Sequence, residues 1–258
     1  MLMSCTKSEW NRGLRGGIAL GFLLAAALLA AVNTAHATPL VQIASVQVSS
    51  SLGSGEYDVD VPFSPSGDYS FVLTSPVSIF SNDVNHNLLA TINPFGLAVS
   101  LSSDPAAGLS FGVLAAGVPT NFVISTMPVT FAALNSPVGI ASAALTVTDL
   151  DATGASISGA YPGAMSFQAA SNVGTFAYLA PSISATAQQS QASTPNVPPT
   201  VGNVLGAITS VQSTFSFQLS ANDLGSGSGT FSVPEPATFA LLAIAAIGLA
   251  AVHRRRSS

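Results

Sequence analysis

Apolar and polar residues alternate one by one along much of the region between residues 38 and 232. In residues 214–220, Phe215, Phe217 and Leu219 fall on one face of an extended chain, and polar residues fall on the other. A period of two predicts a β-strand with one buried face. Six further segments follow the same pattern: residues 41–43, 46–48, 69–74, 97–101, 121–125 and 145–148.

Clusters of Gly, Pro, Asn, Asp and Ser separate these segments and predict turns. They occupy residues 49–55, 65–68, 93–94, 104–105, 136–137, 151–154 and 161–163. No stretch of the region places apolar residues at helical spacing. We therefore predict an all-β body, an antiparallel β-sandwich (jelly-roll or Ig-like) of about eight to twelve strands. A closed barrel is the alternative that this pattern leaves open.

Two stretches late in the body differ from the rest. Residues 180–200 are rich in small and polar side chains and contain four prolines, which predicts a linker or long loop. Residues 201–232 return to the strand pattern, and the glycines at 225, 227 and 229 predict a turn between two strands. We expect this last pair to complete the same sandwich, because an isolated hairpin is marginal in water. A small separate C-terminal unit is the alternative.

The body, residues 38–232, contains no Lys and no Arg. With nine acids and no bases its net charge is −9 when histidine is neutral. Such a surface cannot neutralise phosphates, which argues against nucleic-acid binding. Ion pairs between lysine or arginine and a carboxylate are impossible within it. The nine acids are Glu56, Asp58, Asp60, Asp68, Asp83, Asp104, Asp149, Asp151 and Asp223.

Residues 1–37 have the organisation of a secretory signal peptide. Three basic residues precede an apolar run at 18–32, and Ala35 and Ala37 supply the small residues that signal peptidase requires. We expect the mature chain to begin at Thr38; an uncleaved signal anchor is the alternative. Cys5, the only cysteine, would leave with the signal, so the mature body could form no internal disulfide.

The last segment, residues 233–258, has three parts in a fixed order. The prolines of the first part favour an extended backbone, which a processing enzyme can bind. The sixteen apolar residues that follow predict a transmembrane helix, and the basic cluster should remain cytoplasmic. In order, the parts are Val233-Pro234-Glu235-Pro236, the apolar run 237–252, and Arg254, Arg255 and Arg256.

This tail resembles the PEP-CTERM sorting signal of bacterial surface proteins. The resemblance implies recognition by an exosortase, a membrane-embedded protease or transpeptidase, and release to the cell surface or extracellular matrix. It also implies a setting of exopolysaccharide and biofilm. A plain tail anchor behind a proline linker is the alternative. The matching residues are 233–238, Leu241-Leu242, Gly248-Leu249 and Arg254 to Arg256.

Few residues in the body offer nucleophilic or acid–base chemistry. His86 is its single histidine, and no serine lies in a Gly-x-Ser-x-Gly motif. Neither a cysteine nucleophile nor a Schiff-base lysine is available after maturation. We therefore predict no catalytic residues, no enzymatic activity and no cofactor, and expect His86 to be an exposed loop residue.

Two pairs of carboxylates are the remaining candidates. Asp58 and Asp60 should share one face of a strand, and Asp149 and Asp151 lie beside a turn. Paired carboxylates occur in glycosidases, but those enzymes usually add aromatic platforms, and the body has no tryptophan. Oxygen ligands also make the pairs weak Ca²⁺ candidates. The Asp149 loop lacks the EF-hand glutamate, so solvated turn acids are the simpler interpretation and no metal is predicted.

Together these observations favour a non-catalytic exported protein, transiently anchored in the inner membrane and then sorted to the surface by an exosortase. A hydrolase or carbohydrate-binding module that uses the same route is the second hypothesis. A permanently anchored membrane protein is the third.

Overall fold

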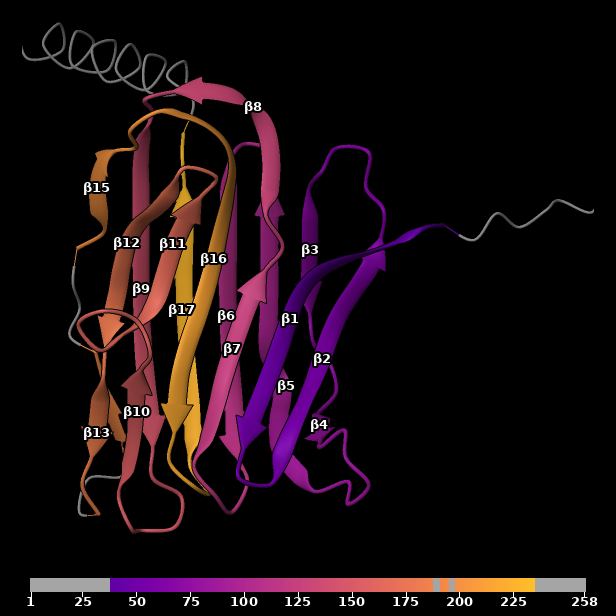
Figure 1. Cartoon of the computed structure of the whole chain (residues 1–258), viewed down its shortest axis with the longest axis vertical. Helices are drawn as coiled ribbons and strands as arrows, with labels where there is room; N and C mark the ends of the chain where they lie inside the picture. Colours follow the sequence, from indigo (N-terminus) through magenta and orange to yellow (C-terminus); the bar gives the residue numbers. More distant parts are fainter. Residues whose placement is uncertain (1–37, 188–190, 195–197, 235–258) are drawn as a thin grey trace, which may run out of the picture. The chain divides into compact units, whose positions relative to one another are not determined.

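The computed structural model describes residues 38–187, 191–194 and 198–234. These residues form two antiparallel β-sheets that face each other, as the alternating pattern predicts (Figure 1). The described residues contribute seventeen strands, more than the twelve allowed by the sequence estimate, because several short edge strands lack clear alternation. They contain no apolar helix of membrane-spanning length.

The first sheet follows the order β12-β11-β16-β7-β1-β2, with β8, β10 and β13 paired beside this path. All of its pairings are antiparallel. Its strands are β1 (Leu40–Ser50), β2 (Gly53–Pro62), β7 (Thr120–Thr126), β8 (Val129–Asn135), β10 (Ala155–Gly159), β11 (Met165–Ser171), β12 (Gly174–Pro181), β13 (Ile183–Ala185) and β16 (Ala207–Leu219).

The second sheet follows the order β14-β9-β17-β6-β5-β3, with β15 and β4 beside this path. Its longest strand, β5, continues past Asn93 and Pro94 through a register shift instead of turning there. Its strands are β3 (Tyr69–Val72), β4 (Val77–Phe80), β5 (Leu88–Ser102), β6 (Ala106–Ala115), β9 (Val138–Thr148), β14 (Gln191–Ser193), β15 (Thr200–Asn203) and β17 (Leu224–Ser232).

Aromatic rings from both sheets fill the space between them. Phe215, Phe217 and Leu219 of β16 are buried on one face, as their alternation predicts. Phe111 of β6 lies 4.9 Å from Phe215 and 5.1 Å from Phe217 between ring centroids, and so joins the sheets. Because described residues include no Lys or Arg, burial of apolar surface at about 25 cal/mol per Å² is the main stabilising contribution.

The glycines at 225, 227 and 229 do not form a turn, and that prediction is wrong. They lie inside β17, which pairs with β6 on one side and β9 on the other. A Cβ built on Gly227 would lie 2.7 Å from Leu145 and Phe111 atoms, and one on Gly229 would lie 2.4 Å from the Phe167 ring. The glycines therefore leave room for core side chains, which explains a strand without alternating bulk.

Residues 180–200 also contain more strand than their composition indicates. The described part includes the end of β12, then β13, which pairs with β10, and β14, which pairs with β9. Each of these pairs is only a few residues long. The stretch is therefore attached to both sheets at the same side of the sandwich, and β15 continues the contact with β9.

Candidate functional site: a polar sheet face and the root of the C-terminal tail

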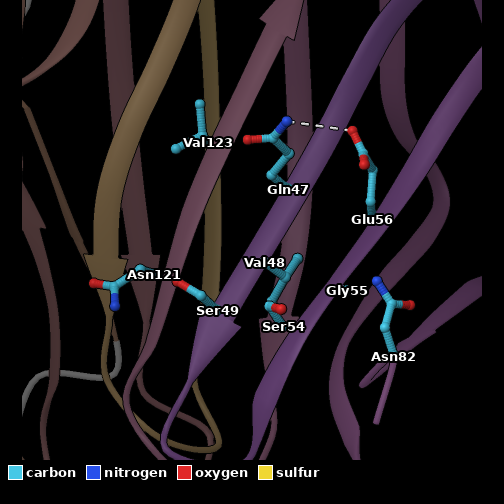
Figure 2. A pocket seen from close by; sticks show the side chains of 9 residues that line it. All are labelled: Gln47, Val48, Ser49, Ser54, Gly55, Glu56, Asn82, Asn121 and Val123. Carbon is cyan, nitrogen blue, oxygen red and sulfur yellow. Dashed lines mark hydrogen bonds between the residues drawn. The ribbon is translucent and has the colours of Figure 1, made fainter.

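A polar groove crosses the outer face of the first sheet over β1, β2 and β7 (Figure 2). Its volume is about 310 Å³. Across it, Nε2 of Gln47 donates a hydrogen bond to Oε1 of Glu56 at 3.3 Å. The lining residues are Gln47, Val48, Ser49, Ser54, Gly55, Glu56, Asn82, Asn121 and Val123.

Strand pairing explains why these side chains meet. Ser49 is opposite Asn121 in the β1–β7 pair, and alternate residues of a strand point to the same face. The backbone N–H of Asn82 donates to the carbonyl of Ser54 at 2.8 Å, which holds the connection after β4 beside β2. A Cβ on Gly55 would lie only 2.2 Å from the Phe80 carbonyl oxygen, so this close approach requires glycine.

The groove belongs to a wider face of amide and hydroxyl side chains. Near one end of the sheet a single row of exposed polar residues crosses five strands. Within this row Nε2 of Gln218 donates to Oδ1 of Asn121 at 3.2 Å. Nearer the middle of the sheet, the hydroxyls of Ser45 and Ser125 lie 3.2 Å apart. In order across the sheet, the row is Ser54, Ser49, Asn121, Gln218 and Ser158.

A pair of tyrosines lies at the β12 side of this face. The Tyr161 and Tyr178 rings stack with centroids 5.3 Å apart, and Tyr178 is paired with Gln168 in the β11–β12 ladder. Burial, and then the nearby Tyr178, raises the pKa of Tyr161 to about 12, so its hydroxyl is protonated at neutral pH. In the sequence the tyrosines look scattered; the bridge between Tyr161 and Met165 brings this pair together.

Asp58 and Asp60 lie together on the exposed face of β2, as the alternation predicts. Partial burial, and then repulsion from Glu56 and Asp60, raises the pKa of Asp58, while a hydrogen bond from Gln42 opposes this shift. β2 is an edge strand of the main path of its sheet. Charges on an edge strand discourage pairing with another chain, so these carboxylates have a structural explanation that requires no metal.

Asp149 and Asp151 lie near a third carboxylate, that of Asp223. One ligand oxygen from each of the three lies within 4.8 Å of the others. Asp149 accepts the backbone N–H groups of Ala152 and Gly154 at 2.8 and 3.0 Å. Oxygen atoms are the ligands that Ca²⁺ prefers. Much of the hydrogen-bond acceptor capacity of Asp149 is, however, already used by backbone N–H groups of the turn.

Asp223 is the site residue that sequence reasoning missed. It is 0% exposed, accepts a hydrogen bond from the Ser220 hydroxyl, and accepts the Leu150 N–H at 3.3 Å. Burial raises the pKa of Asp223. No local motif indicates this role, because Asp223 lies more than seventy positions from Asp149 and only the sheet pairing joins them.

His86 has a left-handed backbone in the exposed connection between β4 and β5.

The C-terminal tail begins inside the folded body. Val233 is 0% exposed, its N–H donates to the Pro105 carbonyl at 2.8 Å, and Pro234 is half-buried. Glu235, Pro236, the apolar run 237–252 and Arg254 to Arg256 lie outside the described residues. The expected signal peptide, residues 1–37 with Ala35 and Ala37, lies outside them as well.

The described residues form a β-sandwich, and its last described strand, β17, leads directly into the C-terminal segment 233–258. Residues 232–256 match the family model described as the PEP-CTERM protein-sorting motif. The chain therefore carries the signal of an exosortase substrate, which implies export and membrane-anchored sorting with exosortase as the processing partner. No curated protein matches the chain.

Proposed function

We propose that this chain is a non-catalytic surface or matrix protein that an exosortase processes near Pro234-Glu235-Pro236, and that its body binds exopolysaccharide. The observation that supports the binding proposal most is the outer face of the β12-β11-β16-β7-β1-β2 sheet. Its rows of exposed amides and hydroxyls run across neighbouring strands and include the groove of Figure 2. A biofilm setting, with the protein retained in the matrix, follows from this proposal.

Hydroxyls and amides suit a saccharide because each sugar hydroxyl both donates and accepts hydrogen bonds. Ser, Asn and Gln side chains offer both functions, and ordered water can extend their reach. The stacked Tyr161 and Tyr178 add aromatic surface at one side of the face. Since the body has no cation and a net charge of −9, it should repel polyanions. The ligand class proposed is therefore a neutral polysaccharide.

A non-catalytic role is supported by the chemistry available around the groove. Its one carboxylate, Glu56, is hydrogen-bonded to Gln47, whereas most glycosidases require two carboxyl groups flanking the scissile bond. Asp58 and Asp60 lie farther along the exposed face of the same strand. A hydrolase is therefore the less favoured alternative. The other alternative, a carbohydrate-binding module, agrees with the proposed binding of a polysaccharide by the body.

Affinity electrophoresis of the purified protein through gels containing dextran, soluble glucan or alginate tests the binding proposal. Replacing the bonded pair Asn121 and Gln218 with alanine should weaken neutral-glycan binding about thirtyfold, since two hydrogen bonds contribute roughly 1 kcal/mol each. The matched control is S70A/S100A, a pair of exposed residues on the other sheet. Equal mobility of all three proteins in every neutral glycan would contradict the proposal.

A further inference from the structure

The end of the sandwich at which β17 finishes is called the exit end here. It carries the tail root, Ser232 and Val233, from which the C-terminal segment leaves the body. Ser232 lies between Ala106 of β6 and Ile140 of β9, so it is fixed from both sides. Val233 is held by burial and by its bond to Pro105. The first chain atoms free to leave the body are therefore those just after Val233.

Very little chain separates this point from the apolar run. Only Pro234, Glu235 and Pro236 lie between Val233 and residue 237. At no more than about 3.6 Å per residue, the distance from Val233 to the start of the run is at most about 14 Å. The headgroup layer of one leaflet is roughly 5–8 Å thick. While the run spans a bilayer, the exit end must therefore lie at the membrane surface.

One side of the exit end carries three exposed apolar side chains, called the apolar corner here: Val173, Val201 and Leu205, with 47%, 62% and 81% of their surfaces exposed. Val201 pairs with Ile140, which pairs with Ser232, so Val201 lies two strands, or about 10 Å, from the tail root. The turn between β11 and β12, which contains Val173, lies at the same end as β15 (Figure 1).

Val173 and Leu205 line a common hollow of about 410 Å³ with Phe176 and Val204. A Cβ built on Gly206 would lie 3.6 Å from Cγ1 of Val173, which places the two connections in contact. None of the residues that line this hollow is charged. Val173 and Leu205 therefore lie together at this hollow, and Val201 lies close by on β15 without lining it. Desolvating the hollow against lipid headgroups leaves no charge unpaired.

The β3 side of the exit end carries two carboxylates. Asp104 precedes β6 and Asp68 precedes β3, beyond β17 in the strand order. Hydrogen bonds from the N–H and hydroxyl of Ser103 lower the pKa of Asp68, which keeps it ionised and hydrated. A body tethered at β17 can therefore lower its β15 side onto lipid while its β3 side stays in water.

We infer that the apolar corner rests in the headgroup region of a bilayer while the tail anchors the chain, and that this contact sets the orientation of the body before processing. The inference depends on the membrane-anchored sorting in the proposed function. The partner is the lipid surface, and zwitterionic lipid suits it best, because no Lys or Arg of the body can pair with anionic headgroups.

Site-specific fluorescence on the full chain in phosphatidylcholine vesicles tests this inference. Cys5 is the only cysteine, so a C5S background permits one labelled position at a time. The dye NBD is placed at Leu205→Cys and, as the control, at Val84→Cys. Val84 is 94% exposed in the connection that precedes β5, at the end opposite the tail root.

The expected result is blue-shifted emission at position 205, with several-fold stronger quenching there by a headgroup spin-labelled lipid than at position 84. Equal, water-like emission from both positions in vesicle-bound protein would overturn the inference and leave the sorting proposal intact. Protein that fails to float with the vesicles would instead contradict membrane anchoring, and with it the proposed route. Matching circular dichroism spectra of both variants exclude misfolding as the cause.

Discussion

Gly229 shows how a single missing side chain can determine packing between the sheets. The space that its Cβ would occupy lies 2.4 Å from Cε2 of Phe167, a ring that is fully buried and contacts Phe215. A ring in that position has backbone on one side and another ring on the other. Even a methyl group at residue 229 must therefore displace the core.

Gly229→Ala should destabilise the protein by about 1–3 kcal/mol, the usual cost of overpacking a filled core. Urea unfolding followed by circular dichroism measures this change. Gly108→Ala is the matched control in the neighbouring strand β6, because a Cβ there would make only ordinary contacts from 3.5 Å outward. Equal midpoints for the two variants would show that the Phe167 ring can move freely.

Asp223→Asn should raise thermal stability near neutral pH by a few degrees, about the effect of 1 kcal/mol in a domain of this size. Burial raises the folded-state pKa of Asp223, so the native state binds its proton more tightly than the unfolded state. The contribution of Asp223 is therefore most favourable below the unfolded pKa and is lost as pH rises through the folded pKa.

The difference in melting temperature between D223N and the natural protein should accordingly shrink toward pH 3.5. Asp104→Asn, in an exposed turn, is the control for removal of one negative charge. A D223N variant that is less stable than the natural protein at pH 7 would mean that the Ser220 and Leu150 hydrogen bonds outweigh the desolvation of the carboxylate.

Residue patterns predicted some of the candidate site and missed the rest for a physical reason. The alternation in β2 correctly put Asp58 and Asp60 on one exposed face, because strand geometry is local. The approach of Asp223 to Asp149, and the stacking of Tyr161 on Tyr178, depend on pairings between distant segments. Register of that kind is decided by the whole core and leaves no signature within either segment.

Among the elements, β17 is both the last described strand and a central one. It is hydrogen-bonded to β6 and β9 along its entire length. The two halves of the second sheet are therefore joined only when β17, near the C-terminus, has paired with both strands. Its sequence looks like a turn because glycines replace the larger residues of a typical strand. The sandwich itself was predictable from β1, β7 and β16, whose alternation is clear, whereas β17 depends on the shape of its neighbours.

Truncation tests the role of this element. A chain ending at Pro234 should fold into a β-rich body without the membrane run, whereas a chain ending at Asp223 should not fold. A chain ending at Ser232 should fold with a lower free energy of unfolding than the first, because it lacks Val233. Loss of a buried valine typically costs about 1–3 kcal/mol. Circular dichroism and protease resistance of the secreted fragments provide the measurement. A well-folded chain ending at Asp223 would contradict the assignment of β17 as a central strand.

At the scale of the whole molecule, we expect the uniform negative charge of the body, residues 38–232, to oppose association. Glu56, Asp58 and Asp60 follow one another on an edge strand, where like charges oppose pairing with a second copy. The raised pKa of Asp58 means that it is protonated earlier than an ordinary aspartate as pH falls. Acidification therefore weakens this protection before it neutralises Asp68, Asp83 and Asp151, whose pKa values hydrogen bonds lower.

E56Q/D58N/D60N should form larger particles at neutral pH, as the natural protein should when the pH approaches 4. Light scattering at several pH values follows both. Neutralising Asp83, Asp104 and Asp151 instead removes the same charge from exposed connections outside β2, and should have a smaller effect. Equal association of the two triple variants would show that net charge, rather than the β2 edge, controls assembly.

The position at which the C-terminal segment is cleaved depends on how that segment is attached to the folded body. Because Val233 is locked into the core, processing should occur on its C-terminal side and leave β17 complete. Intact-mass spectrometry of the protein recovered from the cell surface measures both ends at once. We predict a chain that starts at Thr38, retains Val233 and lacks Arg254 to Arg256, while the natural sequence with all three arginines changed to Gln accumulates unprocessed. Surface protein that still ends at Ser258 would contradict exosortase processing, and a cut before Ser232 would contradict the structural role of β17.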